Sequence, residues 1–168
     1  MMDTAACLAL NYKAAMRRLV ASVTIVTSRD LLTGVRCGMT ATAVTSLTAD
    51  PPALLVCVNR SASMHPTLAI GSRFCVNVLG EPHGALARAF GGETEPLRRF
   101  DAGVWGEDPD SVPFLMDAAA TVFCAVDQLI DYATHSIVIG RVYAAGGDTS
   151  QRSLIWADGG FAKLVVMD

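Results

Sequence analysis

The sequence predicts a mainly β protein, a closed or nearly closed antiparallel barrel with a few helices at its periphery. Six or seven segments of strand length lie between turn signals along the chain. Helical segments are few and do not alternate regularly with strands, as a parallel sheet would require. A length of 168 residues suits one domain with a substantial core, so we expect a single domain over residues 1–168.

The first expected element is a helix over residues 8–20. Its apolar side chains, among them Leu8, Tyr12 and Met16, recur at the spacing that places them on one helical face. We therefore expect this helix to lead into the domain.

The next elements are expected to be strands. Residues 22–29 alternate between apolar and polar side chains, and a turn ending at Gly34 leads to a second alternating stretch, 36–48. These two stretches should form a hairpin. After the proline-rich break at 50–52, the continuous apolar run 53–58 should be a strand buried on both faces.

The rest of the chain follows the same pattern. Residues 59–72 read as a loop that opens a short helix, with Ser63 as its N-cap and Gly71 at its end. Residues 91–114 are too rich in glycine, proline and charge for regular structure. The other expected elements are a strand at 73–79, a helix at 82–90, and strands at 120–132, 135–146 and 161–167.

The composition of the chain argues against some classes of partner and for others. The formal net charge is −3 and only 17% of residues are charged, which disfavours a nucleic-acid partner. Hydrophobic residues make up 52% of the chain and the mean hydropathy is +0.40, so apolar surface would stay exposed unless another subunit covers it. This composition favours an obligate oligomer.

Location can also be predicted. No run approaches the roughly 20 apolar residues that a membrane span needs. The N-terminal stretch has an acidic residue at position 3 and its basic residues after the apolar part, the reverse of a secretory signal. We expect a cytoplasmic protein without a membrane anchor.

Several kinds of site are absent from the sequence. The five cysteines never approach the C-x-x-C spacing of a zinc or redox site and are expected to be small buried residues. Three scattered histidines give no metal-binding pattern. The motifs of P-loop, Rossmann, serine hydrolase and zincin sites are also missing, so no metal site is expected.

What remains is the chemistry of an anion site. Thr40, Thr42 and Ser46 share one face of the stretch 36–48, and the segment 59–63 adds an asparagine, an arginine, two serines and free backbone N–H groups. Such donors suit a phosphate. An ideal strand separates Thr40 from Ser46 by roughly 20 Å, so the ligand should be elongated unless the chain bends. The alternative is that threonine and serine simply favour an exposed strand face.

Six blocks of sequence, in order, resemble a known family. They are GMTATAVTSLTADPPALLVCVNRSAS, RFCVNVL, ALARAFGG, RRF, THSIVIGRV and SLIWADGGFAKL. They are similar to the flavin reductase components of two-component flavin-dependent monooxygenases, including the reductases that serve 4-hydroxyphenylacetate oxidation and pyrimidine utilisation. The resemblance runs from about residue 12 to residue 164. It implies a split β-barrel of Greek-key type that forms a homodimer and binds FMN or FAD at the dimer interface.

The resemblance also implies which residues contact the flavin. A strand would lie along it, a loop would reach its phosphate end, and a short block would complete the contact. These positions are Thr40, Ala41, Thr42, Ala43, Val44, Ser46 and Leu47 in the strand, Asn59, Arg60, Ser61, Ala62, Ser63 and Met64 in the loop, and Phe90 with Gly91. Among them, the resemblance points to Arg60 and the serine hydroxyls as the phosphate ligands.

His135 can be interpreted in two ways. On periodicity alone it is a buried structural histidine, because it shares a strand face with Ile137 and Ile139. By resemblance it faces the nicotinamide of the reductant and is the catalytic candidate. Ala133 stands where relatives commonly have glycine, and Phe161 where many have tyrosine.

The implied activity is an NAD(P)H:flavin oxidoreductase. It would reduce FMN or FAD by hydride transfer, with NADH or NADPH as co-substrate, and release the reduced flavin to a separate monooxygenase. Two alternatives use the same scaffold. One is a flavin-binding protein without turnover, and the other is a reductase of a non-flavin acceptor such as a corrin.

Overall fold

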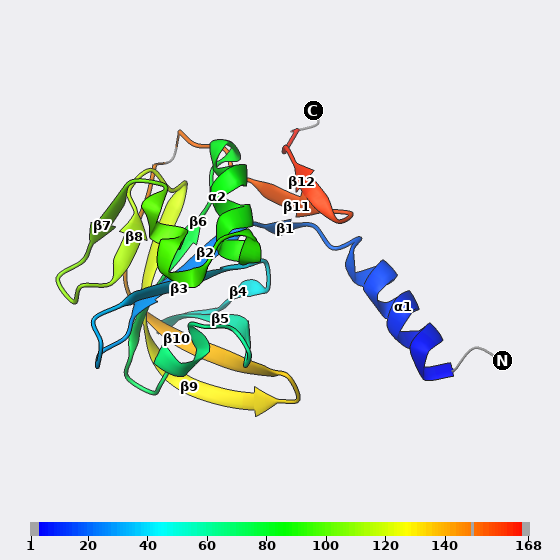
Figure 1. Ribbon diagram of the computed structural model, residues 1–168, viewed down its shortest axis with the longest axis horizontal. Helices are drawn as coiled ribbons and strands as arrows, with labels where there is room; N and C mark the ends of the chain where they lie inside the picture. The colour runs from blue at the N-terminus through cyan, green and yellow to red at the C-terminus, as the bar shows by residue number, and fades with distance from the viewer. Residues whose placement is uncertain (1–3, 149, 166–168) are drawn as a thin grey trace.

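The computed structural model describes residues 4–148 and 150–165, and its centre is a seven-stranded antiparallel sheet (Figure 1). The strand order across this sheet is β3-β2-β6-β9-β10-β5-β4. Its strands are β2 (Thr24–Arg29), β3 (Arg36–Ala41), β4 (Val44–Ala49), β5 (Pro52–Asn59), β6 (Arg73–Val78), β9 (Ala120–Tyr132) and β10 (His135–Gly146). The antiparallel arrangement confirms the predicted fold class, and β2 and β3 form the predicted hairpin.

The smaller elements lie around this sheet. Strands β1 (Ala21–Ser22), β11 (Ile155–Ala157) and β12 (Gly160–Ala162) make a three-stranded sheet, and β7 (Trp105–Glu107) pairs with β8 (Pro113–Leu115). The helices are α1 (Thr4–Met16) and α2 (Gly84–Arg88), with short turns η1 (His65–Thr67), η2 (Glu81–His83), η3 (Ala89–Glu93) and η4 (Pro96–Asp101).

A bend at Thr42 and Ala43 makes the sheet curl into a barrel. The stretch 36–48 is two strands and not the single strand expected, and these two strands end up at opposite edges of the sheet. Laid flat, seven strands would place their outer members roughly 29 Å apart, whereas the chain from Ala41 to Val44 spans at most roughly 11 Å. The sheet must therefore curl until β3 and β4 meet. The Cys57 N–H donates to the Ala43 carbonyl at 3.0 Å and ties the bend to β5.

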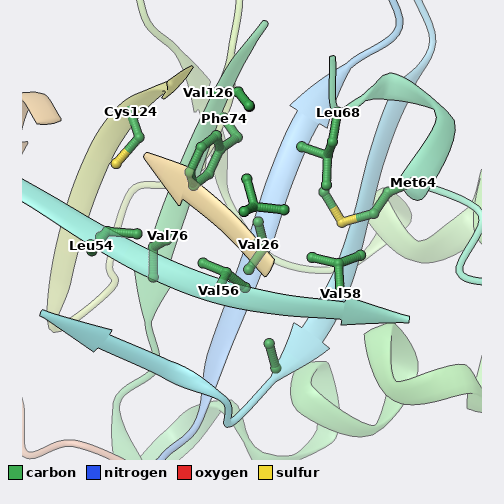
Figure 2. Packing of buried hydrophobic residues seen from close by; sticks show 12 residues of the cluster. Val26, Leu54, Val56, Val58, Met64, Leu68, Phe74, Val76, Cys124 and Val126 are labelled. Atoms are coloured by element: carbon green, nitrogen blue, oxygen red, sulfur yellow. The ribbon is translucent and has the colours of Figure 1, made fainter. Parts of the chain in front are cut away.

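The barrel interior is filled by apolar side chains from six strands and from the segment 64–68 (Figure 2). On β5 the buried residues alternate as Leu54, Val56 and Val58, and the residues between them are half-buried. The run 53–58 is thus a strand, but only one of its faces is fully buried. Fully buried large side chains such as Phe74 and Met64 complete this core.

A second core lies outside the barrel, where α2, η3 and η4 pack with β2 and β8. Phe90, Phe100 and Trp105 pack with ring centroids 4.8–5.4 Å apart. These residues belong to the predicted helix at 82–90 and to the stretch 91–114, which was expected to be irregular. The second expectation is wrong, because η4 and the β7–β8 pair lie within that stretch.

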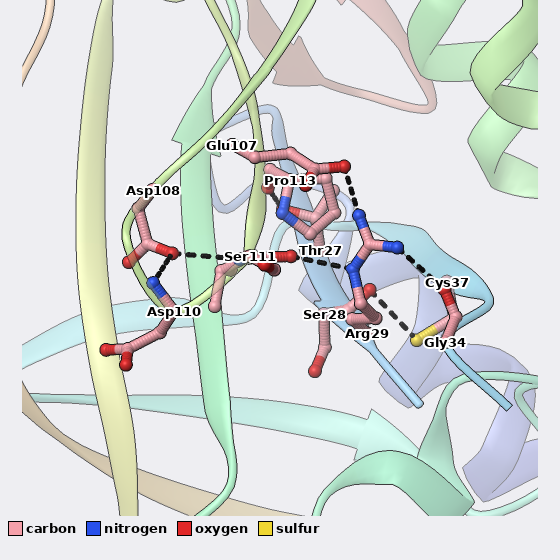
Figure 3. Close-up of polar contacts among 11 residues, drawn as sticks. Thr27, Ser28, Arg29, Gly34, Cys37, Glu107, Asp108, Asp110, Ser111 and Pro113 are labelled. Atoms are coloured by element: carbon pink, nitrogen blue, oxygen red, sulfur yellow. Dashed lines mark hydrogen bonds and ion pairs between the residues drawn. The ribbon is translucent and has the colours of Figure 1, made fainter. Parts of the chain in front are cut away.

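Arg29 fixes this stretch to the β2–β3 turn (Figure 3). Its guanidinium donates to the carbonyls of Gly34 at 2.7 Å and Ser111 at 2.8 Å, and pairs with Glu107. Beneath it, the buried Asn77 amide donates to the Ile25 carbonyl and accepts from the Leu115 N–H, at 2.9 and 2.7 Å. Polar contacts with distant strands thus give the stretch 91–114 a regular structure that its composition did not predict.

The helix α1 projects away from the barrel (Figure 1). It begins and ends earlier than the expected range 8–20, and its apolar residues are uncovered: Leu8 is 70% exposed and Tyr12 is 62% exposed. The apolar stripe is therefore left uncovered by the part of the chain that the structure describes. No helix in the described ranges has both the length and the apolar character needed to cross a membrane.

Three smaller expectations fare differently. The predicted helix after residue 59 is only the 3-10 turn η1, with Met64 and not Ser63 at its N-cap. Of the expected strand 161–167, only the first part is in β12, and residues 166–167 lie outside the described part of the chain. The five cysteines are free and buried or half-buried, and burial raises the pKa of Cys37, Cys75 and Cys124, which makes these three thiols unreactive.

Gly140 offers a test of the packing in the barrel. A Cβ at this position would lie 2.4 Å from Cζ of Phe74 and 2.9 Å from Cβ of Cys124. We expect Gly140→Ala to lower the free energy of unfolding by about 1–3 kcal/mol through overpacking. Gly146→Ala, on the same strand but 3.6 Å from its nearest neighbour, is the control and should change stability by under about 0.5 kcal/mol. Urea denaturation measures both, and equal effects would contradict the packing argument.

Candidate functional site

Three hollows that share lining residues run along β3 on the side of the barrel. The aromatic hollow, about 400 Å³, lies between Thr40, Thr42, Trp156 and Phe161. It shares Thr40 and Gly91 with the central hollow, about 340 Å³, which is lined by Met39, Thr40, Ser61, Ala62, Ser63, Phe90, Gly91, Pro96 and Arg99. The central hollow shares Ser63 and Pro96 with the outer hollow, about 230 Å³. Together they could receive an elongated ligand.

An apolar groove of about 780 Å³ lies beyond the bend, along β4. Val44 and Ser46 line it, together with residues of β1, β5, β6 and β10. The predicted row of hydroxyls is therefore divided: Thr40 and Thr42 face the aromatic hollow, while Ser46 faces the apolar groove. The bend that the spacing argument left open is present.

The predicted strand residues differ in how they can contribute. Thr40 Oγ1 donates to the Ala87 carbonyl at 2.6 Å, which fixes the wall between two hollows. Ala41 is 7% exposed and its side chain packs in the barrel core, so only its backbone could meet a ligand. Ala43 and Leu47 are exposed and line none of these hollows.

Asn59 shapes the loop that follows β5. Its Oδ1 accepts hydrogen bonds from the Ser61 N–H at 2.9 Å and the Ser61 hydroxyl at 2.8 Å. The Asn59 carbonyl accepts from the Ala62 N–H at 2.9 Å. The loop thereby brings Ser61, Ala62 and Ser63 into the lining of the central hollow, while Met64 is buried in the barrel core.

Arg60 points elsewhere. Its Nη2 lies 4.0 Å from Oδ2 of Asp131, both side chains are half-exposed, and Arg60 lines none of the hollows. A contact between Arg60 and a phosphate in the central hollow would require this side chain to turn. The structure therefore brings together the serines of the predicted loop but not its arginine.

His135 begins β10 beside the same loop. Its Cα pairs with that of Asn59, and its Nδ1 lies 2.9 Å from the Thr134 hydroxyl. The side chain is exposed, so the alternative of a buried structural histidine is wrong. The buried neighbour is Ser136, whose hydroxyl contacts His65 Nε2 at 2.8 Å and donates to Asp131 at 2.5 Å.

Some lining residues were not assigned a role from the sequence. Trp156 and Phe161 pack edge to face at 5.3 Å and, with Arg88 over the Phe161 ring, form one wall of the aromatic hollow. Arg99 lines the central hollow. Burial lowers the pKa of the Arg99 guanidinium, and the charge of Glu95 acts in the opposite direction, so the group stays cationic. Arg99 belongs to the block RRF, and Trp156 and Phe161 belong to the block SLIWADGGFAKL; both blocks were quoted for the resemblance alone.

No metal site accompanies these hollows. Within residues 4–148 and 150–165, no three histidine, cysteine, aspartate or glutamate side chains are grouped in a way that could hold a metal ion. The arrangement instead offers hydroxyl, backbone and guanidinium donors next to aromatic walls. Such a site can bind an anion attached to a flat ring system.

Comparison with known proteins agrees with this chemistry. The family described as flavin reductase like domain matches residues 16–164. An FMN reductase (NADH) RutF from Variovorax paradoxus is 43% identical over 148 residues, which cover 88% of this chain and 81% of that relative. The reductase component of a FADH(2)-dependent resorcinol hydroxylase from Rhizobium is 37% identical over 146 residues, 87% of this chain and 82% of that relative.

Solved structures show the same fold. The NADH:FAD oxidoreductase SgcE6 from Streptomyces globisporus, solved in complex with NAD and FAD fragments, superposes with a TM-score of 0.84. The two chains are 28% identical, and the match covers 94% of this chain and 93% of that one.

Ala133 provides a test of the turn that precedes His135. Its φ is 49°, in the left-handed region that glycine adopts without strain and alanine does not. We expect Ala133→Gly to raise the free energy of unfolding by roughly 1 kcal/mol, measured by thermal and urea unfolding. Ala145→Gly, in a β10 position without positive φ, should instead lower stability by roughly 0.5–1 kcal/mol. If both substitutions destabilise the protein, the backbone at Ala133 is not strained.

Proposed function

This chain belongs to the flavin reductase-like domain family, and from that premise we propose that it is an NADH-dependent flavin reductase. It would reduce FMN or FAD and supply the reduced flavin to a separate monooxygenase. The observation that carries the proposal is the convergence at the central hollow. Three segments distant in sequence, represented by Thr40, Ser61 and Phe90, line one hollow of about 340 Å³.

The residues present fit a flavin mononucleotide. Its phosphate would meet the hydroxyls of Ser61 and Ser63 and the N–H groups of their loop. Its ring would lie toward Thr40, Thr42 and the aromatic wall formed by Trp156 and Phe161. The hollows connect through shared residues, so one elongated molecule can occupy both.

The protein's part in the reaction is binding and orientation. When bound, the flavin would supply the hydride-accepting chemistry, and hydride transfer from a reduced nicotinamide needs no general base from the protein. The hollows would hold the flavin in place, and His135 beside the loop would orient the nicotinamide. The names of the relatives, which specify NADH, support NADH over NADPH as the reductant.

We also propose that the chain works as a homodimer in the cytoplasm. The helix α1 and the strand β4 are exposed, and the apolar groove lies along β4. A second copy placed on this face would cover them and enclose the hollows. Five free cysteines suit a reducing compartment. The receiving partner would be an oxygenase component, as in the resorcinol hydroxylase system of the relative.

The first test follows NADH absorbance at 340 nm with purified protein and FMN, FAD or riboflavin added in turn. Catalytic oxidation, many turnovers per protein chain, is the expected result. Stoichiometric flavin binding without turnover would instead indicate a flavin-binding protein. Turnover with a corrin but with no flavin would indicate the other alternative.

The second test concerns His135. We expect His135→Ala to raise KM for NADH about tenfold or more while Kd for FMN changes less than about twofold, because the proposed role of the side chain is to orient the nicotinamide and it does not line the flavin hollows. His83→Ala is not a suitable control, since His83 is bonded to Gly80 and Asp117. Tyr132→Ala, exposed on the strand paired with His135, is the matched control and should change neither value. Equal loss of NADH and FMN binding would make His135 a structural residue.

A further inference from the structure

Two hydrogen bonds hold the Arg99 side chain in the lining of the central hollow. Its Nη1 donates to the Gly38 carbonyl at 2.9 Å and its Nε donates to the Thr94 carbonyl at 3.1 Å. These two bonds use two of the five N–H groups of the guanidinium. The others are available to a ligand in the hollow that Arg99 lines.

The charge of Arg99 lacks a direct partner. Among the described residues, no carboxylate lies within 4.0 Å of its guanidinium, although Glu95 is close enough to influence it. The other arginines near these hollows differ. Arg60 faces Asp131, and Arg88 lies 3.8 Å from Glu93. Arg36 lines the outer hollow, and its guanidinium stacks on the Phe100 ring.

A half-buried, immobilised and unneutralised guanidinium is a good anion site. Holding the group in place beforehand lowers the entropy lost on binding, and partial removal from water strengthens a charge-assisted hydrogen bond. Ser61 and Ser63 line the same hollow and supply neutral donors beside it. An anion placed there would therefore meet donors from β3, the 59–64 loop and η4 together.

We propose that Arg99, and not Arg60, is the cation that holds the flavin phosphate. This inference rests on the proposed flavin reductase function, and it names the flavin phosphate as the group that Arg99 binds. The same contact would serve FMN and the first phosphate of FAD, because both place a phosphate at the end of the ribityl chain. Riboflavin, which lacks the phosphate, would not use it.

The test compares neighbouring arginines. Arg99→Gln removes the charge, whereas Arg98→Gln alters an adjacent arginine that is exposed and pairs with Asp101 at 3.2 Å. We expect Arg99→Gln to raise Kd for FMN and FAD by about 10- to 100-fold and to change Kd for riboflavin less than about threefold. Arg98→Gln should leave all three values within about twofold. Flavin fluorescence quenching measures each Kd.

Two further variants keep the result decisive. Arg60→Gln should resemble Arg98→Gln; a selective loss of FMN in Arg60→Gln would assign the phosphate to Arg60 and overturn the proposal. Arg99→Lys keeps the charge but replaces the planar five-donor fork with a compact ammonium that does not reproduce its geometry, so FMN should bind about three- to tenfold more weakly. This variant also gives a result if Arg99→Gln fails to fold. An unchanged ratio of FMN to riboflavin affinity in Arg99→Lys would also overturn it.

The outcomes separate the two proposals. If Arg99→Gln weakens all three flavins equally, Arg99 supports the fold through Gly38 and Thr94 and does not read the phosphate. If the wild-type protein prefers FMN to riboflavin through Arg99 but never oxidises NADH, the reductase proposal fails while the phosphate contact stands.

Discussion

The rest of the structure depends on the bend at Thr42 and Ala43. Only these two residues separate β3 from β4, yet the two strands occupy opposite edges of a seven-stranded sheet. This connectivity forces the barrel to curl. It also divides the polar face of one sequence stretch between two places, so that Thr40 meets the 59–64 loop and Ser46 meets the apolar groove. The position of the candidate site follows directly from the closure of the barrel.

The candidate site continues the packing of the second core. Phe90 is 1% exposed and packs on Phe100, while the edge that remains lines the central hollow. A Cβ on Gly38 would lie 2.9 Å from both the Phe90 ring and the Val26 carbonyl, so only glycine allows this approach of β3 to η3. The Gly38 carbonyl in turn accepts from Arg99. Dense packing thus fixes the backbone group that orients the guanidinium.

The sequence predicted most strands because alternation and turn residues are local signals. The break after Ala41 could not be predicted because the two residues that form it, Thr42 and Ala43, are neither glycine nor proline. Both residue types fit an uninterrupted strand. The β7–β8 pair was not predicted for the opposite reason, because the glycines and prolines around it indicate a loop. Hydrogen bonds with Arg29 and Asn77, which lie on strands distant in sequence, hold this pair in place. In the site, Arg60 was favoured over Arg99 by its place in a motif. Nothing local distinguishes Arg99 from Arg98, and only tertiary contacts place one in a hollow and the other in solvent.

The exposed apolar surface follows from the same architecture. The strand β4 lies at the edge of the sheet, and within residues 4–148 and 150–165 it pairs with β5 alone. An open edge strand invites pairing with another chain or cover by one. Leu47 on this strand is 49% exposed, and α1 adds Leu8 and Leu10 at 70% and 64%. A monomer would leave these surfaces and the apolar groove in water, at a cost that scales with apolar area. In the homodimer proposed above, one partner surface would cover both β4 and α1. Since the groove lies across the bend from Thr42, that partner would also narrow the access of water to the hollows in which hydride transfer is proposed.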